Sequence, residues 1–165
     1  MARLLIVHHS PTGNLRRLTD AVVSGANDEQ IEGVEVVVRP ALEATADDVL
    51  GADGYLLGTT ANFGYMSGAL KHFFDSTFLQ VGGALSDTGA ADESSGITSG
   101  RPFALYVHGC YDTNGAVRSV MSIVSALGWR QAAETLEVMG DVDDSDHAAA
   151  YELGGTLAAL LMADS

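Results

Sequence analysis

The sequence predicts an α/β fold in which helices cover both faces of a doubly wound, five-stranded parallel sheet. Short apolar runs, typical of strands buried on both faces, alternate with segments whose apolar residues recur at helical spacing. Right-handed crossovers between such strands place helices on both sides of the sheet. Five strands fit the order 2-1-3-4-5. Because 165 residues are the length of one ordinary domain, we expect a single domain over residues 1–165.

The predicted strands are the short apolar runs. The first, residues 4–7, is apolar throughout and is followed by polar residues. The second, residues 34–38, ends before Pro40, which cannot donate to a ladder. The other three candidates are residues 54–58, residues 103–107 and the more weakly patterned residues 133–138.

Each predicted helix has one apolar face. We expect a further short helix to begin after Thr45, whose hydroxyl can cap it, and we expect Gly128 to end the fourth helix in a left-handed conformation. The apolar faces consist of Leu15, Leu18, Val22 and Ala26; of Met66, Leu70, Phe73, Phe74 and Thr77; of Val117, Val120, Met121, Val124 and Leu127; and of Leu153, Leu157, Leu160 and Leu161.

Charge and cysteine content exclude several classes of partner. The net charge is −14, from 22 acidic and 8 basic residues, which argues against nucleic acid and against an anionic membrane surface. The longest apolar run, residues 157–163, is far shorter than a membrane span. The single cysteine, Cys110, excludes an internal disulfide and favours a reducing compartment. We therefore expect a cytoplasmic protein.

One stretch has neither helical nor strand periodicity. Residues 82–100 are rich in Gly, Ser, Ala and Asp. We expect a long, mobile loop there, which is either a lid or a plain connection.

The loop after the first strand has the composition of an anion site. Ser10-Pro11-Thr12-Gly13-Asn14 leads directly into a helix, whose free N–H groups and dipole attract a negative charge. The hydroxyl and amide side chains add neutral donors, and the glycine lets the backbone approach closely. This chemistry suits a phosphate monoester. The alternative is an ordinary strand-to-helix turn capped by Thr12 or Asn14.

Two segments carry a family resemblance. Residues 10–14 resemble the phosphate loop of flavodoxins, Ser-x-Thr-Gly-Asn-Thr, with Leu15 in place of the second Thr, where only the backbone N–H can serve. Residues 58–68, Gly-Thr-Thr-Ala-Asn-Phe-Gly-Tyr-Met-Ser-Gly, resemble Gly-Thr-Pro-x-Arg-Phe-Gly-x-Met-x-Gly of NAD(P)H:quinone oxidoreductases of the tryptophan-repressor-binding type, with Thr60 and Asn62 replacing Pro and Arg. The resemblance implies a flavodoxin-like fold and FMN as cofactor.

The resemblance also implies which residues border the flavin. Backbone groups of Thr60, Ala61, Asn62, Phe63 and Gly64 would meet the polar edge of the ring, with the phenyl ring packed beside it. The alternative is that this phenylalanine is tucked into the core.

A third loop, after the fourth strand, would wrap the other side of the ring. It contains His108, Gly109, Cys110 and Tyr111; the tyrosine would flank the flavin, and the amides of Gly109 and Cys110 would reach its pyrimidine carbonyls. The alternative is a helix entry capped by Asp112 or Thr113, which is compatible with the first role. His8, His9 and His108 all lie at strand ends, where a metal site is conceivable, but no carboxylate or Cys at ligand spacing supports one, and we expect no metal.

Two flavoprotein functions remain open. The first is an oxidoreductase that takes hydride from NADH or NADPH and passes electrons to a quinone or to free flavin. The second is a flavodoxin, a one-electron carrier that docks redox proteins through its acidic surface. The segment at 62–68 and the lack of a Trp at the flavin loops (Trp129 follows the fourth helix) favour the enzyme. No catalytic residue is nominated, and a homo-oligomer is left open.

Overall fold

The central sheet is built from the apolar runs of the sequence. The computed structural model describes residues 1–92 and 96–164. Its long parallel strands are β1 (Ala2–His8), β2 (Val34–Pro40), β3 (Gly54–Asn62) and β7 (Pro102–Gly109), and the sheet order is β2-β1-β3-β7-β8. In order of the main strands this is 2-1-3-4-5, which confirms the prediction.

The fifth strand is broken, so the prediction of one strand over 133–138 is wrong. β8 (Arg130–Gln131) pairs with the start of β7, and β9 (Leu136–Met139) pairs with its end. From Phe103↔Gln131 to Tyr106↔Leu136, β7 advances three positions whereas the fifth strand advances five, so two residues are pushed out of the ladder.

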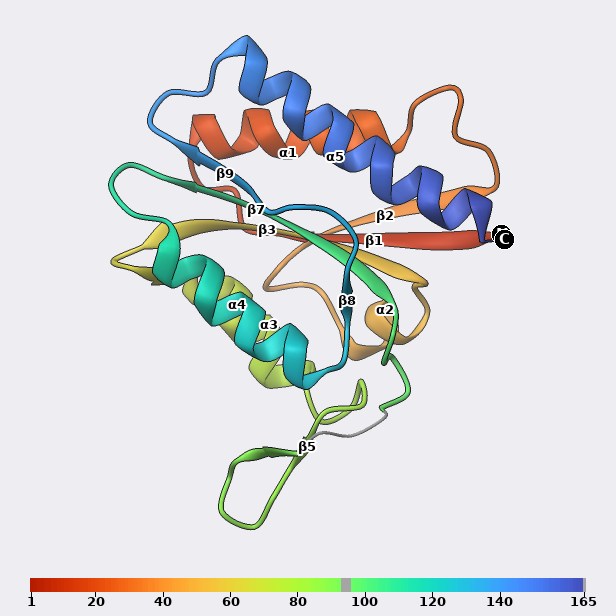
Figure 1. The fold of residues 1–165 in the computed structure, drawn as a ribbon, viewed down its shortest axis with the longest axis vertical. Helices are drawn as coiled ribbons and strands as arrows, with labels where there is room; N and C mark the ends of the chain where they lie inside the picture. Colours follow the sequence, from red (N-terminus) through yellow and green to blue (C-terminus); the bar gives the residue numbers. More distant parts are fainter. Residues whose placement is uncertain (93–95, 165) are drawn as a thin grey trace.

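Helices cover both faces of the sheet (Figure 1). α1 (Gly13–Ala26) and α5 (Asp144–Ala163) lie side by side on one face, and α2 (Ala46–Leu50), α3 (Gly68–Thr77) and α4 (Asn114–Ala126) cover the other. Successive strand residues point to opposite faces, so Leu4 and Ile6 belong to the α1–α5 core while Leu5 and Val7 belong to the other. This two-sided burial explains the continuous apolar runs.

The predicted helix boundary residues are confirmed. The Thr45 hydroxyl accepts from the Asp48 amide at the start of α2, and the Asp48 carboxylate accepts from the Thr45 amide, which completes a capping box. Gly128 follows α4 with φ +72°. In the part of the chain that the structure describes, no helix is both long and apolar enough to cross a membrane.

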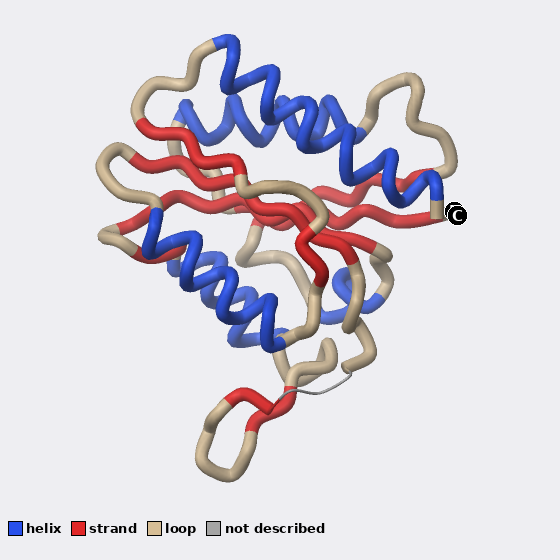
Figure 2. The backbone as a smooth tube through the Cα atoms, in the orientation of Figure 1, coloured by secondary structure: helices blue, strands red, loops and turns tan. Residues whose placement is uncertain are grey.

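The segment 82–100 is not irregular throughout, as the sequence suggested. β5 (Ala84–Leu85) and β6 (Ala91–Asp92) form a short antiparallel pair on an arm that projects from the helical layer (Figure 2). The returning chain is anchored where the buried Thr98 hydroxyl donates to the Val81 carbonyl at 2.7 Å. Residues 93–95 of the predicted mobile loop lie outside the described residues, and its mobility stays a prediction.

Candidate functional site

A cavity of about 420 Å³ lies at the carboxyl ends of β1, β3 and β7. This is the edge at which open α/β sheets bind ligands. All three predicted loops contribute to it, and the second and third contribute every residue that the sequence nominated. Its lining consists of Thr12, Thr60, Ala61, Asn62, Phe63, Gly64, His108, Gly109, Cys110, Tyr111 and Asp112.

The first loop presents free backbone donors to this edge. Thr12 is the N-cap of α1, and its hydroxyl accepts from the Leu15 amide at 3.3 Å. The Leu15 side chain is fully buried. Among the described residues, the amides of Gly13 and Asn14 have no hydrogen-bond partner. The positive end of α1 therefore keeps two N–H groups beside a cavity-lining hydroxyl.

Two side chains of this loop are engaged elsewhere. The Ser10 hydroxyl lies 2.9 Å from His8 Nδ1 and 2.8 Å from the Thr19 hydroxyl. The Asn14 amide oxygen accepts from the Val142 amide at 3.1 Å and so ties α1 to the chain before α5. In this conformation neither side chain lines the cavity.

The Ser10 hydroxyl belongs to a hydrogen-bonded chain that the sequence analysis missed. The Thr19 hydroxyl in turn lies 2.8 Å from the Tyr106 hydroxyl, on the face of the sheet that α1 and α5 cover. Burial raises the pKa of Tyr106 and lowers the pKa of His8. A neutral His8 accepts through Nδ1, so each hydroxyl can donate towards the histidine. No sequence motif indicates this chain, because its members come from three separate elements.

The second loop is a β-hairpin, a pairing that the sequence did not indicate. Thr60, Ala61 and Asn62 form the end of β3, and the chain returns as β4 (Tyr65–Met66), with Ala61 opposite Met66. Met66 therefore precedes α3, which is capped by the Ser67 hydroxyl. The sequence therefore predicts that residues 60–64 lie at the cavity, but not that β3 pairs with β4, because this pairing depends on the turn at Phe63 and Gly64.

The hairpin turns through only Phe63 and Gly64, with φ values of +51° and +75°. Positive φ at both central positions is what a type I′ turn requires, and a bulky residue there is strained. A Cβ added to Gly115 would lie 1.8 Å from the Gly64 carbonyl oxygen, so the turn contacts the start of α4 through backbone atoms. The hairpin is thus fixed by pairing on one side and by α4 on the other.

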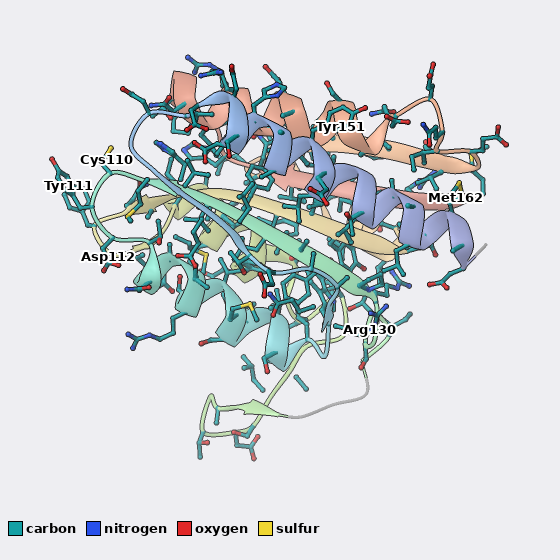
Figure 3. All side chains as sticks on the ribbon, turned by 45° about the horizontal axis from the view of Figure 1, so that its top comes forward. Cys110, Tyr111, Asp112, Arg130, Tyr151 and Met162 are labelled. Carbon is teal, nitrogen blue, oxygen red and sulfur yellow. The ribbon has the colours of Figure 1, made fainter. Side chains whose placement is uncertain are left out.

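Two exposed aromatic side chains stand on the rim of the cavity. Phe63 is fully exposed, so the alternative that it is tucked into the core is wrong. Tyr111, on the loop after β7, is 96% exposed and projects from the end of the molecule next to Cys110 and Asp112 (Figure 3). The two predicted flanking residues therefore lie on two different rim loops of one cavity.

Two buried polar groups add to the lining. The Thr60 hydroxyl is buried without a hydrogen-bond partner among the described residues. His108 is buried, and its Nε2 lies 2.6 Å from the Gly140 carbonyl oxygen. A carbonyl only accepts, so Nε2 carries the proton. In residues 1–92 and 96–164, no three His, Cys, Asp or Glu side chains gather as metal ligands.

Sequence comparisons find two kinds of relative. No family model matches the chain. A flavodoxin from Aquifex aeolicus is 35% identical over 85 residues, which are 52% of this chain and 45% of that protein. An NAD(P)H dehydrogenase (quinone) from Acidithiobacillus ferrooxidans is 30% identical over 47% of this chain and 48% of that protein. The chain thus spans about half the length of these curated relatives.

Structural comparisons agree on the fold. A flavodoxin from the domain Archaea matches with a TM-score of 0.76 at 16% identity, over 96% of this chain and 98% of that one. A flavodoxin, WrbA-like protein from Agrobacterium tumefaciens matches with a TM-score of 0.72 at 14% identity, over 100% of both chains. The chain therefore has a flavodoxin-like fold and is similar in sequence, over about half of its length, both to a flavodoxin and to an NAD(P)H dehydrogenase (quinone).

Proposed function

We propose that the cavity binds FMN and that the protein is an NAD(P)H-dependent oxidoreductase acting on a quinone or on free flavin. The residues fit the cofactor. The free amides of Gly13 and Asn14 suit its phosphate. The unpartnered Thr60 hydroxyl is a buried polar group that needs a partner, which a polar ligand supplies. Phe63 and Tyr111 offer their rings to the isoalloxazine.

When bound, the flavin would supply hydride-transfer chemistry: the nicotinamide gives up two electrons and one proton, and the acceptor takes up two electrons with that proton and a second one from solvent. The role of the protein is to hold the ring and to leave one face open. The β3–β4 hairpin supports this role best. Its turn has two residues, and the Gly64 carbonyl is packed against Gly115, so the backbone beside the ring is held in one conformation.

That single conformation favours the enzyme over the carrier. A one-electron carrier gains from a backbone carbonyl that turns towards flavin N5 as the ring is half reduced. Turning the Phe63–Gly64 peptide would have to change the positive φ of Gly64, directly beside the Gly64 carbonyl that is packed against Gly115. We therefore expect an amide donor at N5.

A specific observation favours the alternative, a flavodoxin-type electron carrier. Exposed carboxylates lie at and near the cavity edge: Asp112 lines it, Asp141 and Asp143 lie between β9 and α5, and Asp144 begins α5. The Gly140 amide bonds to the Gly109 carbonyl at 2.9 Å, which holds this acidic segment beside the third loop. Such a rim would attract a basic redox protein.

Anaerobic reduction distinguishes the two functions. For the enzyme, NADH or NADPH should bleach the bound flavin in one two-electron step, and a benzoquinone should re-oxidise it rapidly. The carrier function is supported instead if neither nicotinamide reduces the flavin while dithionite gives a persistent one-electron form with long-wavelength absorbance.

The lone, exposed Cys110 is consistent with the cytoplasmic location that we also propose.

A further inference from the structure

A second cavity lies on the other side of the β3–β4 hairpin, between α3 and α4. Its volume is about 440 Å³, within the range of ligand sites. Gly64 lines both this groove and the flavin cavity, so the two meet at the hairpin turn. The groove is lined by Gly64, Tyr65, Lys71, Gly115, Arg118, Ser119, Ser122 and Ile123.

The groove contains two of the few basic residues of this acidic chain. Arg118 is exposed on α4, and among the described residues its guanidinium has no hydrogen bond or ion pair. Most of the other arginines are engaged: Arg101, for example, donates to the carbonyl oxygens at the end of α2. The Arg118 guanidinium is therefore available to pair with an anionic ligand in this groove.

Lys71 adds a second, easily released charge. Its ammonium lies 2.8 Å from the Asp75 carboxylate on the next turn of α3, and this contact raises the pKa of Lys71. Both side chains are partly exposed, so the pair is weak and can yield to a ligand. Lys71 and Arg118 both lie near the N-terminal ends of their helices and so bring their two positive charges to the same groove.

The rest of the lining suits an aromatic base with attached phosphates. Tyr65 is 44% exposed, and together with Ile123 it offers an apolar surface. The hydroxyls of Ser119 and Ser122 lie on the same helix as Arg118. We propose that this groove holds the adenylate and phosphate groups of the nicotinamide dinucleotide, so that its nicotinamide end passes Gly64 and reaches the flavin cavity.

This inference rests on the proposed function and deepens it. A protein of net charge −14 repels a dinucleotide that carries two or more negative charges, so local cations beside the reacting ring are needed to bind it. Arg118 supplies the planar fork that fits phosphate oxygens, and Lys71 supplies a point charge. Neither residue lines the flavin cavity itself.

The first test measures binding alone. The FMN-loaded protein is titrated calorimetrically with adenosine 2′,5′-bisphosphate and with ADP. We expect Arg118→Ala to weaken binding about fivefold or more, Arg118→Lys to recover part of the loss, and added salt to weaken the native protein more than the Ala variant. The matched control is Arg130→Ala, another exposed arginine, which lies at the other end of the sheet from Tyr111 (Figure 3) and should change affinity less than twofold.

The second test separates this inference from the proposed function. NADPH and reduced nicotinamide mononucleotide, which lacks the adenylate half, are compared as donors. If the groove acts as proposed, Arg118→Ala raises KM for NADPH, leaves kcat nearly unchanged and does not affect the mononucleotide. If neither donor reduces the flavin, the proposed enzyme function is wrong, while Arg118-dependent binding of the adenylate probes still supports the groove. Equal probe binding by the native and Ala proteins overturns the inference.

Discussion

Because the turn at the cavity rim is strained, we expect the Phe63→Asn variant to be more stable than the native protein when no flavin is bound, and to bind FMN more weakly. Phe63 is the one non-glycine residue with positive φ in the described chain. Asn adopts this left-handed conformation far more readily, and Asn-Gly is the preferred pair for a type I′ turn.

The expected gain is about 1 kcal/mol. The left-handed conformation costs an ordinary L-residue roughly 1–2 kcal/mol, and Asn pays only part of this. No burial is lost to offset the gain, because the Phe63 side chain is fully exposed. For a chain of this size, about 1 kcal/mol corresponds to a rise of about 2–4 °C in Tm. The lost ring should at the same time weaken FMN by roughly 1.5–3 kcal/mol, the free energy of burying a phenylalanine side chain.

Urea unfolding of the apoprotein, followed by circular dichroism, measures the first effect, and fluorescence titration with FMN measures the second. Tyr111→Asn is the matched control: it removes an equally exposed aromatic whose φ is not positive, and its stability should change by less than about 0.5 kcal/mol. If Phe63→Asn is no more stable than this control, the turn carries no strain and the reasoning is wrong.

The remaining predictions concern the loop at residues 10–14, the half-buried His8 and the projecting arm. Thr12→Ala should weaken FMN binding by roughly 1–3 kcal/mol and, because the Thr12 hydroxyl caps α1, should lower the free energy of unfolding by about 0.5–2 kcal/mol. Thr12→Ser should restore both quantities. An unchanged FMN titration of the Ala variant would contradict the role of Thr12 in phosphate binding. Burial lowers the pKa of His8, so below the ordinary histidine pKa near 6.5 this residue binds a proton more readily in the unfolded chain than in the folded one. The free energy of unfolding should therefore fall as the pH drops from about 6.5 to the pKa of His8 in the folded protein. The His8→Gln variant should lack this part of the pH dependence. Limited proteolysis should cut first within residues 82–100, and early cuts inside β1, β3 or β7 would refute the predicted mobility.

The sheet was predictable because its periodicity is local. Residues such as Leu4 and Leu5 are buried against different helix layers, and that arrangement demands the continuous apolar run visible in the sequence. The break in the fifth strand was not predictable, because it depends on how β8 and β9 pair with β7, and no local sequence pattern indicates that pairing. The arm at 84–92 was missed for a related reason, since strands of two residues carry no measurable alternation.

The candidate site was predictable in position but not in conformation. Three loops at the strand ends could be nominated from composition, and the cavity brings them together. The actual partners of Ser10 and Asn14 are the Thr19 hydroxyl and the Val142 amide, and such long-range partners leave no signature in a loop motif. The hairpin was hidden because Phe-Gly is not a usual type I′ pair, so turn statistics argue against what the structure adopts.

That disagreement between local preference and structure is itself an argument for a ligand at the hairpin. A left-handed phenylalanine that is fully exposed pays a conformational cost and gains no burial within the chain. Covering its ring would recover roughly 1.5–3 kcal/mol, more than the strain costs, but only something outside the chain can do so. The proposed flavin cavity and the groove between α3 and α4 both border this turn through Gly64. Phe63 lines only the first of these, so a ligand in that cavity would compensate the strained residue, and its affinity should fall in variants that remove the Phe63 ring.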